Sequence, residues 1–349
     1  MIDSDIPPAV VRAVVKSRGI VDIKKRDAGL SGGMVAHCRS ADGQEYALKR
    51  WPNSIPLNRI ESIHRVVIHA WNQGCTTVAR PLSVHPLTNE IRLSSSDTVL
   101  SAAGENWELA QWRPGVAATT DAGLDAIRLG GELIGQFHQA TAALESHCQR
   151  APIIQERLRV LASHQQHLPA AMQWIQQSGR DGNLAASLRD AASLIHWKWD
   201  EAQDKIHRSL LQDSDNSVTT QYVLRDVHAQ HILFSSGRVT GLIDFDAVRI
   251  DTPASDLARW AGSFLSGQHS AGDIWEATFE GYRSTCELTG SGDEQQLVRM
   301  AKNLCFAGTW LSLANWLVWL LVERRDFEAP PGILAERIYN LIRVATAHD

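Results

Sequence analysis

Apolar and polar positions follow two different periods along this chain, and the change from one to the other divides it into two parts. Residues 7–18 carry apolar positions three and four apart, begin with two prolines and are followed by Gly19, so they predict a short helix. Up to residue 112 most other apolar runs are short and bounded by turn-forming residues, as is typical of strands. The predicted strands lie at residues 20–23, 34–39, 45–51, 91–93 and 107–112, and one helix is predicted at residues 59–71.

Beyond the segment R-P-G at residues 113–115, which interrupts both periods and predicts a linker, helical spacing dominates. Helices are expected at residues 126–143, 153–177, 184–211 and 294–322. One strand-rich segment interrupts them, with strands predicted at residues 222–224, 232–234 and 239–243 and a turn at 235–238. The pattern predicts an α+β protein with a small β-rich domain at residues 1–113 and a larger, mainly helical domain at residues 114–349.

The stretch from residue 306 to residue 322 has no charged residue and is almost long enough to span a bilayer. Three polar residues in its middle and charged residues on both flanks argue against a membrane span, and no second segment resembles it. The polar residues are Thr309, Ser312 and Asn315. We therefore expect a buried helix of the larger domain, and no membrane contact.

Composition narrows the class of protein. The 349 residues include 44% hydrophobic and 21% charged residues, which is typical of a globular protein, and the net charge of −5 gives no basic surface for nucleic acid. The five cysteines are scattered and include no C-x-x-C pair, which argues against a disulfide framework and a zinc site. With an acidic start that does not resemble a signal peptide, a cytoplasmic location is expected.

Two aspartates, Asp226 and Asp244, each stand at the polar edge of an apolar run. Phosphoryl transfer from ATP uses one carboxylate to orient the acceptor hydroxyl and another to hold magnesium. A hairpin between the two could present both carboxylates together. Alternatively, each aspartate only caps a turn or a helix, as most loop aspartates do.

Five motifs follow one another along the chain. They are a glycine loop at residues 29–33, Y-A-L-K at 46–49, L-x-D-x-x-x-x-H at 224–231, I-D-F-D at 243–246 and D-x-P-x-x-D-L-A at 251–258. Their order resembles that of the aminoglycoside phosphotransferase and choline kinase group of the protein-kinase-like fold. The resemblance covers nearly the whole chain and is most specific in the last two motifs. It implies a two-lobed fold that uses ATP and Mg²⁺, with ATP between the lobes.

The resemblance also implies roles for individual residues. Asp226 would position the acceptor hydroxyl, and Asp244 would be the principal magnesium ligand. Lys49 would contact the α- and β-phosphates as a compact positive charge. Asp246 would add an oxygen ligand beside Asp244.

Further nucleotide contacts are implied by position. Glycines would let the backbone approach the phosphates closely, in a loop that contains Gly29, Ser31, Gly32 and Gly33. Main-chain groups of the hinge would pair with adenine, and these belong to Gln111, Trp112 and Arg113. Glu61, in the predicted helix at residues 59–71, would pair with Lys49; alternatively it is a solvated first-turn glutamate favoured by the helix dipole.

Two positions depart from the motif of the group. Leu224 stands where the group has histidine, and His231 stands where it has asparagine as second metal ligand. Because magnesium prefers oxygen ligands, His231 is expected to weaken the second metal site or to shift its metal preference. These departures motivate an alternative, a nucleotide-binding pseudokinase with a regulatory role. The presence of Lys49, Asp226 and Asp244 argues against it.

Other residues near these motifs have competing interpretations. His228 and His231 are three positions apart, which invites a zinc site with Asp226, but no further cysteine or histidine completes four ligands. Asp251 and Asp256 are expected to be structural, with Asp256 as the N-cap of the helix that follows it.

The acceptor is the least constrained part of the prediction. The chain contains 12 tryptophans, most of which are expected in the core, although some could form an aromatic wall for a cationic acceptor. We predict an ATP-dependent O-phosphotransferase that acts on a small hydroxylated metabolite or amine-bearing compound, such as an aminoglycoside, choline-like or homoserine-like acceptor. A protein kinase is disfavoured because few residues separate Asp244 from Asp251, leaving no long activation loop. The sequence leaves open the choice among these acceptors, the use of GTP and the oligomeric state.

Overall fold

The computed structural model divides the chain into two compact units. The first comprises Met1–Val116, Leu233–Ser235 and Thr240–Asp246, and the second Ala117–Ile232, Ser236–Val239 and Ala247–Asp349. The structure describes residues 6–25, 33–85, 92–94, 96–177, 182–214, 217–286, 291–327 and 329–347.

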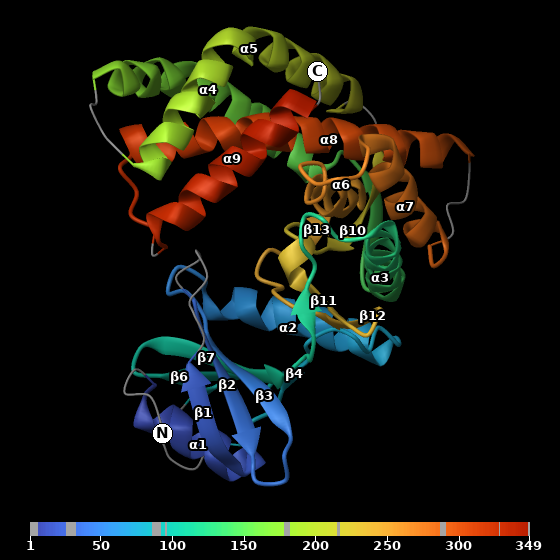
Figure 1. The fold of residues 1–349 in the computed structure, drawn as a ribbon. Coiled ribbons are helices and arrows are strands. Elements are labelled where there is room, and N and C mark those ends of the chain that lie inside the picture. Colours follow the sequence, from blue (N-terminus) through green and yellow to red (C-terminus); the bar gives the residue numbers. More distant parts are fainter. Residues whose placement is uncertain are drawn as a thin grey trace. The chain divides into compact units, whose positions relative to one another are not determined.

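The first unit is built on a seven-stranded antiparallel sheet with the order β1-β2-β3-β7-β6-β5, and β4 pairs with β7 (Figure 1). The strands are β1 (Ile20–Lys25), β2 (Met34–Ser40), β3 (Glu45–Arg50), β4 (Pro81–Leu82), β5 (Arg92–Leu93), β6 (Val99–Ala102) and β7 (Glu105–Gln111). Two helices pack on this sheet, α1 (Pro8–Arg18) against β1 and β6 and α2 (Leu57–Asn72) against β4 and β6. The predicted helices and strands of this part are confirmed.

Local sequence explains where these elements begin and end. Gly19 follows α1 in the left-handed conformation (φ 61°), and its N–H closes the helix by donating to the carbonyl of Val15. The inward residues of α1, β1, β2, β3 and β7 form one apolar core, which includes Val10, Ile23, Leu48, Trp107 and Leu109. The alternation of buried and exposed positions along β2 therefore follows the period of a strand with one buried face.

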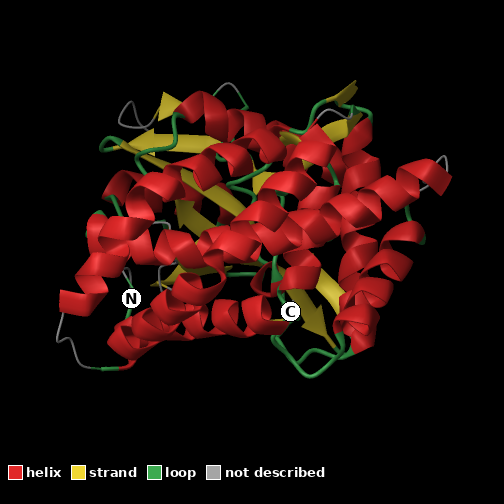
Figure 2. Cartoon of the chain, turned by 90° about the horizontal axis from the view of Figure 1, so that it is seen from above, coloured by secondary structure: helices red, strands yellow, loops and turns green. Residues whose placement is uncertain are grey.

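The second unit is mainly helical, and its long helices dominate the view in Figure 2. The helices are α3 (Leu124–Ala142), α4 (Pro152–Gln177), α5 (Asn183–Ser214), η1 (Ala229–His231), α6 (Ala254–Gly262), α7 (Ala271–Arg283), α8 (Ser291–Leu317), η2 (Val318–Val322) and α9 (Pro331–Ala347). The helices α4, α5, α8 and α9 pack against one another, α3 packs on α7, and α6 packs on α8. The predicted long helices are confirmed, and the last of them passes from α8 into one π-helical turn, η2.

Short strands complete the chain. A three-stranded sheet has the order β13-β10-β9, and another has the order β12-β11-β8. The strands are β8 (Val116–Ala117), β9 (Ser146–Gln149), β10 (Val218–Val223), β11 (Ile232–Ser235), β12 (Arg238–Leu242) and β13 (Arg249–Asp251). The predicted hairpin of β11 and β12 is confirmed. Its end belongs to the first unit, because Leu242 donates to the carbonyl of Thr77 (2.9 Å) and accepts from the N–H of Ala79 (2.9 Å).

Several elements were absent from the sequence prediction. Strand β9 is exposed along its whole length, so no apolar alternation marks it. Helix α7 does carry a local signal, since the Ser270 hydroxyl accepts from the N–H of Asp273 and caps the helix. Helix α9 begins at the second of two consecutive prolines, Pro331, and its exposed face carries the apolar residues Ile333 and Tyr339, so the polar side of its helical pattern is weak.

Among the described residues one helical stretch, Asp293–Val322, is long and apolar enough to cross a membrane. However, 61% of its most apolar window is buried inside the protein. Leu311, Leu313 and Leu317 are fully buried there. The prediction of a buried helix is therefore confirmed.

Candidate active site

In the first unit, Lys49 lies among acidic side chains at the end of the β11–β12 hairpin. Its ammonium group forms an ion pair with Asp246, and its Nζ is 3.7 Å from Asp244 Oδ1. The same Nζ lies 4.3 Å from the centre of the Trp51 ring. The structure thus brings together the predicted phosphate-binding lysine and both carboxylates predicted to bind metal.

Glu108 completes this cluster, and sequence reasoning missed it. The register of β3 and β7 places Lys49 directly opposite Glu108. The Glu108 carboxylate accepts hydrogen bonds from Trp51 Nε1 (3.0 Å) and from His64 Nε2. The other ring nitrogen of His64 is 2.8 Å from Thr98 Oγ1. A buried glutamate in a strand is unusual, and that is the sequence signal that could have marked it.

The electrostatics of the cluster favour a cation beside the aspartates. Burial alone would lower the pKa of Lys49, but Asp246, Glu108 and Asp244 raise it above its usual value. Burial raises the pKa of Asp246 to about 6, and Asp244 and Glu108 add to the effect although Lys49 opposes it. The carboxylates therefore repel one another in spite of the lysine, and a divalent cation would relieve this repulsion.

The backbone around Asp244 is fixed from two sides. Asp244 has a left-handed conformation (φ 64°), which aspartate tolerates better than most residues. The preceding residues are held by the hydrogen bonds of Leu242 described above. After it, the guanidinium of Arg59, in the first turn of α2, donates to the main-chain carbonyl of Asp246 (3.2 Å).

Glu61 and the residues of the glycine loop were also predicted to take part in nucleotide binding, and their outcomes differ. Glu61 is partly buried and lines a surface pocket with Arg65 and His69 of its own helix, while Glu108 takes the place opposite Lys49. The pairing of Glu61 with Lys49 stays a prediction. In the glycine loop, Gly33 is buried directly before β2. The other predicted residues of that loop lie outside the described residues: Gly29, Ser31 and Gly32.

Hydrogen bonds within the protein already use some of the hinge main-chain groups that were predicted to pair with adenine. The N–H of Gln111 donates to the carbonyl of Arg80 (3.0 Å), and that of Trp112 donates to the carbonyl of Glu45 (3.3 Å). The side chain of Arg113 braces this segment by donating to two main-chain carbonyl groups. The predicted adenine contact therefore rests on the N–H of Arg113 and on the carbonyl groups of the segment.

In the second unit, Asp226 follows β10 and forms an ion pair with Arg259 of α6. Burial would raise the pKa of Asp226, but Arg259, His228 and His231 outweigh it and hold the pKa below its usual value. The carboxylate is therefore ionised at neutral pH. It can accept a hydrogen bond from a substrate hydroxyl without first losing a proton.

The rings of the two histidines of this loop contact each other in a tilted arrangement, with ring centres 3.7 Å apart and an angle of 38° between their planes. Burial, His231 and Arg259 lower the pKa of His228 to about 3, so this ring stays neutral. Its Nδ1 accepts from the N–H of Gln230 (3.3 Å), which places the ring proton on Nε2. No group of three or more His, Cys, Asp or Glu side chains suited to a metal ion occurs within the described ranges, so the zinc interpretation gains no support. The metal role of His231 stays a prediction.

The loop before Asp226 is held by one buried carboxylate. Asp256 accepts from the N–H groups of Leu224 (2.7 Å) and Arg225 (2.6 Å) and from His138 Nε2 (2.9 Å). Asp256 lies in the first turn of α6, and the N-cap residue is Pro253. The prediction of Asp256 as N-cap is therefore wrong, because its side chain turns to the loop instead of to its own helix.

Arg225 adds a second anchor. It has a positive φ of 68°, and its guanidinium forms ion pairs with Asp251 and Glu156. Farther along the loop, Ser263 of α6's C-terminal end accepts from the N–H of Ala229 (3.1 Å). The backbone on both sides of Asp226 is thus fixed by side chains of other elements, as a positioned carboxylate requires.

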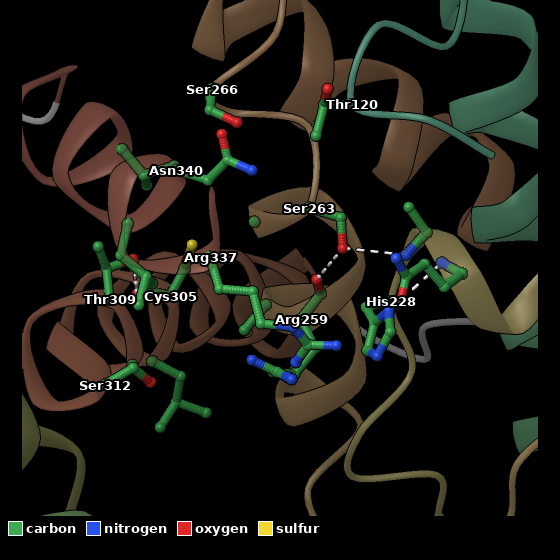
Figure 3. Close-up of a pocket in the computed structure, with 18 of the residues that line it drawn as sticks. Thr120, His228, Arg259, Ser263, Ser266, Cys305, Thr309, Ser312, Arg337 and Asn340 are labelled. Atoms are coloured by element: carbon green, nitrogen blue, oxygen red, sulfur yellow. Dashed lines mark hydrogen bonds between the residues drawn. The ribbon is translucent and has the colours of Figure 1, made fainter. Parts of the chain in front are cut away.

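A cavity of about 610 Å³ lies next to this loop within the second unit (Figure 3). Helices α4, α6, α8 and α9 contribute most of its lining, and His228 and Ala229 come from the loop. Trp316 and Trp319 also line it, but one face of Trp319 is already covered by Arg325, whose guanidinium carbon is 4.9 Å from the ring centre. Other tryptophans of this unit, such as Trp260 and Trp310, are core residues, as predicted.

Comparison with known proteins agrees with this geometry. The family model described as "Phosphotransferase enzyme family" matches residues 29–288. A spectinomycin phosphotransferase in complex with ADP and spectinomycin is 11% identical, with a TM-score of 0.67 over 98% of each chain. The amicoumacin kinase hAmiN, in complex with AMP-PNP, Ca²⁺ and Ami, is 14% identical, with a TM-score of 0.61 over 96% of this chain and 92% of that one.

A third similar structure is an aminoglycoside phosphotransferase from Alicyclobacillus acidocaldarius, which is 18% identical, with a TM-score of 0.57 over 100% of this chain and 93% of the other. The predicted α+β, protein-kinase-like fold is confirmed. No curated protein sequence matches this chain.

Proposed function

The chain belongs to the phosphotransferase enzyme family, and on this basis we propose that it is an ATP-dependent kinase that transfers the γ-phosphoryl group to a hydroxyl of a small molecule. The observation that carries the proposal is the cluster of Lys49 with Asp244 and Asp246. Phosphoryl transfer needs a lysine that contacts the phosphates and carboxylates that bind the metal ion. Two similar proteins are complexes with ADP or AMP-PNP, which supports ATP as the donor.

Each residue of the cluster has a separate task in this proposal. Lys49, kept protonated by its acidic neighbours, binds the phosphates of ATP. Asp244 and Asp246 would hold magnesium, and their oxygen atoms and mutual repulsion fit a hard divalent cation. When bound, the metal would neutralise charge on the phosphate oxygens. Glu108 is a positioning residue that keeps Lys49 opposite it on the neighbouring strand.

Asp226 orients the acceptor. Its ionised carboxylate accepts the hydrogen bond of the substrate hydroxyl and so directs the oxygen toward the phosphoryl group. It receives the hydroxyl proton as the acceptor oxygen bonds to the γ-phosphorus, while the bond from that phosphorus to the β–γ bridging oxygen breaks and ADP leaves. Arg259 holds the carboxylate in place and keeps it ionised. Leu224 supplies its main-chain N–H to Asp256, so this departure from the family motif leaves the loop anchored.

The proposal is tested by magnesium-dependent ATP turnover with a panel of hydroxylated compounds that are cationic, neutral or anionic. Asp226→Asn is expected to lower turnover by about 10²- to 10⁴-fold, because it removes the proton acceptor and keeps the size of the side chain. Lys49→Ala is expected to weaken ATP binding, which is measured separately by calorimetry.

A matched control is Asp190→Asn, since Asp190 is an exposed aspartate on α5. It is expected to retain full turnover. Binding of ATP with no turnover of any acceptor would contradict the kinase and favour the pseudokinase with a regulatory role. Full activity of Asp226→Asn would contradict the role of Asp226.

A further inference from the structure

The cavity beside the Asp226 loop carries an excess of positive charge. Among its charged lining residues are three arginines, contributed by α4, α6 and α9, and one glutamate on α9. The arginines are Arg157, Arg259 and Arg337, and the glutamate is Glu336. His228, the histidine of the lining, is neutral because its pKa is about 3. The cavity is therefore basic in a protein whose net charge is −5.

Two of these arginines have no carboxylate of their own. Arg259 is committed to Asp226. Within the part of the chain that the structure describes, neither Arg157 nor Arg337 forms an ion pair. Glu156, next to Arg157 in the chain, is engaged by Arg225 instead.

The guanidinium group of Arg259 also lies close enough to act on those of both Arg157 and Arg337. Burial lowers the pKa of Arg157 to about 10, and Arg259 contributes to that shift. Partial desolvation likewise lowers the pKa of Arg337, although the residue is exposed, again with a contribution from Arg259 and against the pull of Asp226. Figure 3 shows Arg259 and Arg337 side by side, with His228 near them. Cations that cluster in one cavity repel one another, and an anion that joins them relieves this repulsion.

The rest of the cavity suits a hydroxylated molecule. Polar side chains face it from α8, from the end of α6 and from α9, and they include Thr309, Ser312, Ser263, Ser266 and Asn340 (Figure 3). Gly308 leaves room for the guanidinium of Arg157, since a Cβ there would lie 3.3 Å from Nη2. The cavity also borders the π-helical turn η2, and such turns are frequent at functional sites.

We infer that the acceptor of this kinase is an anionic hydroxylated molecule whose carboxylate or phosphate group is bound by Arg157 and Arg337. The inference rests on the proposed function, because it places the acceptor of that reaction in this cavity. It differs from the expectation of a cationic acceptor on an aromatic wall. A planar guanidinium can bind either oxyanion with two parallel hydrogen bonds. An ammonium group would instead meet three arginines and a Trp319 face that Arg325 covers.

Binding of four related sugars by calorimetry tests this assignment. The probes are glucuronate, glucose 6-phosphate, glucose and glucosamine, which share a hydroxylated ring and differ in charge. AMP-PNP and Mg²⁺ are kept saturating so that the anions do not occupy the nucleotide site. Glucuronate or glucose 6-phosphate is expected to bind at least about tenfold more tightly than glucose, and glucosamine most weakly. The carboxylate and phosphate arms show which oxyanion the arginines prefer.

Variants of the two arginines test whether their guanidinium groups bind the anion. Arg337→Gln and Arg157→Gln are each expected to weaken binding of the preferred anion about tenfold and to leave glucose unchanged, while Arg157→Lys retains part of the affinity. Arg337 is exposed, so its replacement leaves the fold intact. Matched controls on the same helices are Arg159→Gln in α4 and Arg343→Gln in α9, both exposed and outside this cavity.

Two results would overturn the inference. One is that neither anion binds, or that glucose or glucosamine binds as tightly as the better anion. The other is that the two variants at Arg157 and Arg337 bind the anion as wild type does. Because binding is measured without turnover, these outcomes are independent of the ATP turnover that tests the kinase itself.

Discussion

Removing the charge of Glu108 is expected to destabilise the first unit more than removing the charge of Glu61. Glu108 is only 9% exposed, and its carboxylate bonds to Trp51 and His64 opposite Lys49. Glutamine keeps the size of the side chain and one acceptor atom, but it loses the charge that these neighbours compensate. Breaking a buried ion pair costs roughly 3–5 kcal/mol.

The expected cost of Glu108→Gln is smaller than that limit. Asp246 and Asp244 remain beside Lys49 and still compensate its charge, and Trp51 can still donate to the glutamine oxygen. We therefore expect the opening free energy of the sheet to fall by roughly 2–3 kcal/mol. Glu61→Gln, at a partly buried position of α2, is expected to lower it by less, roughly 0.5–1 kcal/mol.

Hydrogen exchange of the amides in β3 and β7 measures this difference locally, without assuming that both units unfold together. Amides of α4 and α5 serve as the internal control, because they belong to the second unit. Equal losses in the two variants, or a larger loss for Glu61→Gln, would refute the argument that Glu108 is the acidic partner on which Lys49 depends.

The same variant predicts a pH dependence. Burial would raise the pKa of Glu108, but His64, Lys49 and Trp51 outweigh it and hold the pKa below its usual value. A carboxylate with a lowered pKa binds fewer protons in the folded state, so its stabilisation is present above the unfolded pKa and is lost as pH falls through the folded one. Protection of β3 and β7 is therefore expected to weaken in acid for wild type and to do so less in Glu108→Gln. Parallel pH curves for the two proteins would contradict this.

Three further predictions concern the second unit. Asp256→Asn is expected to lower kcat at least about tenfold with an unchanged KM for ATP, because it loosens the loop that carries the catalytic aspartate; equal kcat values would contradict it. His231→Asn is expected to raise activity with Mg²⁺ relative to Mn²⁺, since an oxygen ligand replaces a nitrogen; an unchanged ratio would speak against His231 as a ligand. Gly130→Ala would place a Cβ 2.0 Å from the Trp260 ring and is expected to cost roughly 1–3 kcal/mol in thermal unfolding. Gly123→Ala, with nothing within 4 Å, is the control and should cost far less.

The sequence predicted those features that depend on neighbours along the chain. Strand and helix periods located β1 to β3, α2 and the long helices, because each buries one face and its pattern is local. Lys49 could be singled out because the order of the glycine loop, Y-A-L-K and the aspartate motifs resembles that of a known group of phosphotransferases. The hairpin of β11 and β12 was marked by its S-S-G-R turn.

Features that depend on register could not be predicted in this way. Glu108 and Lys49 face each other only because β3 and β7 pair with one particular offset, which no pattern within either strand reveals. The bond from Asp256 to the Leu224 loop is likewise fixed by tertiary packing, and the local rule for helix caps pointed to the wrong partner. Arg157 and Arg337 lie far apart in the sequence and share a cavity only after α4 and α9 have packed around it.

The arginines near the Asp226 loop differ in whether they are paired with carboxylates of the protein, and this difference indicates which of them has a structural role. Arg225 has two carboxylates, Asp251 and Glu156, and its ion pairs tie the loop to other elements, which accounts for its burial. Arg157 lies close by, but its desolvation is not offset by such a pair. A fold can retain a partly buried cation without a paired carboxylate where a ligand supplies the missing charge, since desolvating it for stability alone is unfavourable. The compensated arginine is therefore assigned to the scaffold, and the uncompensated one to the acceptor.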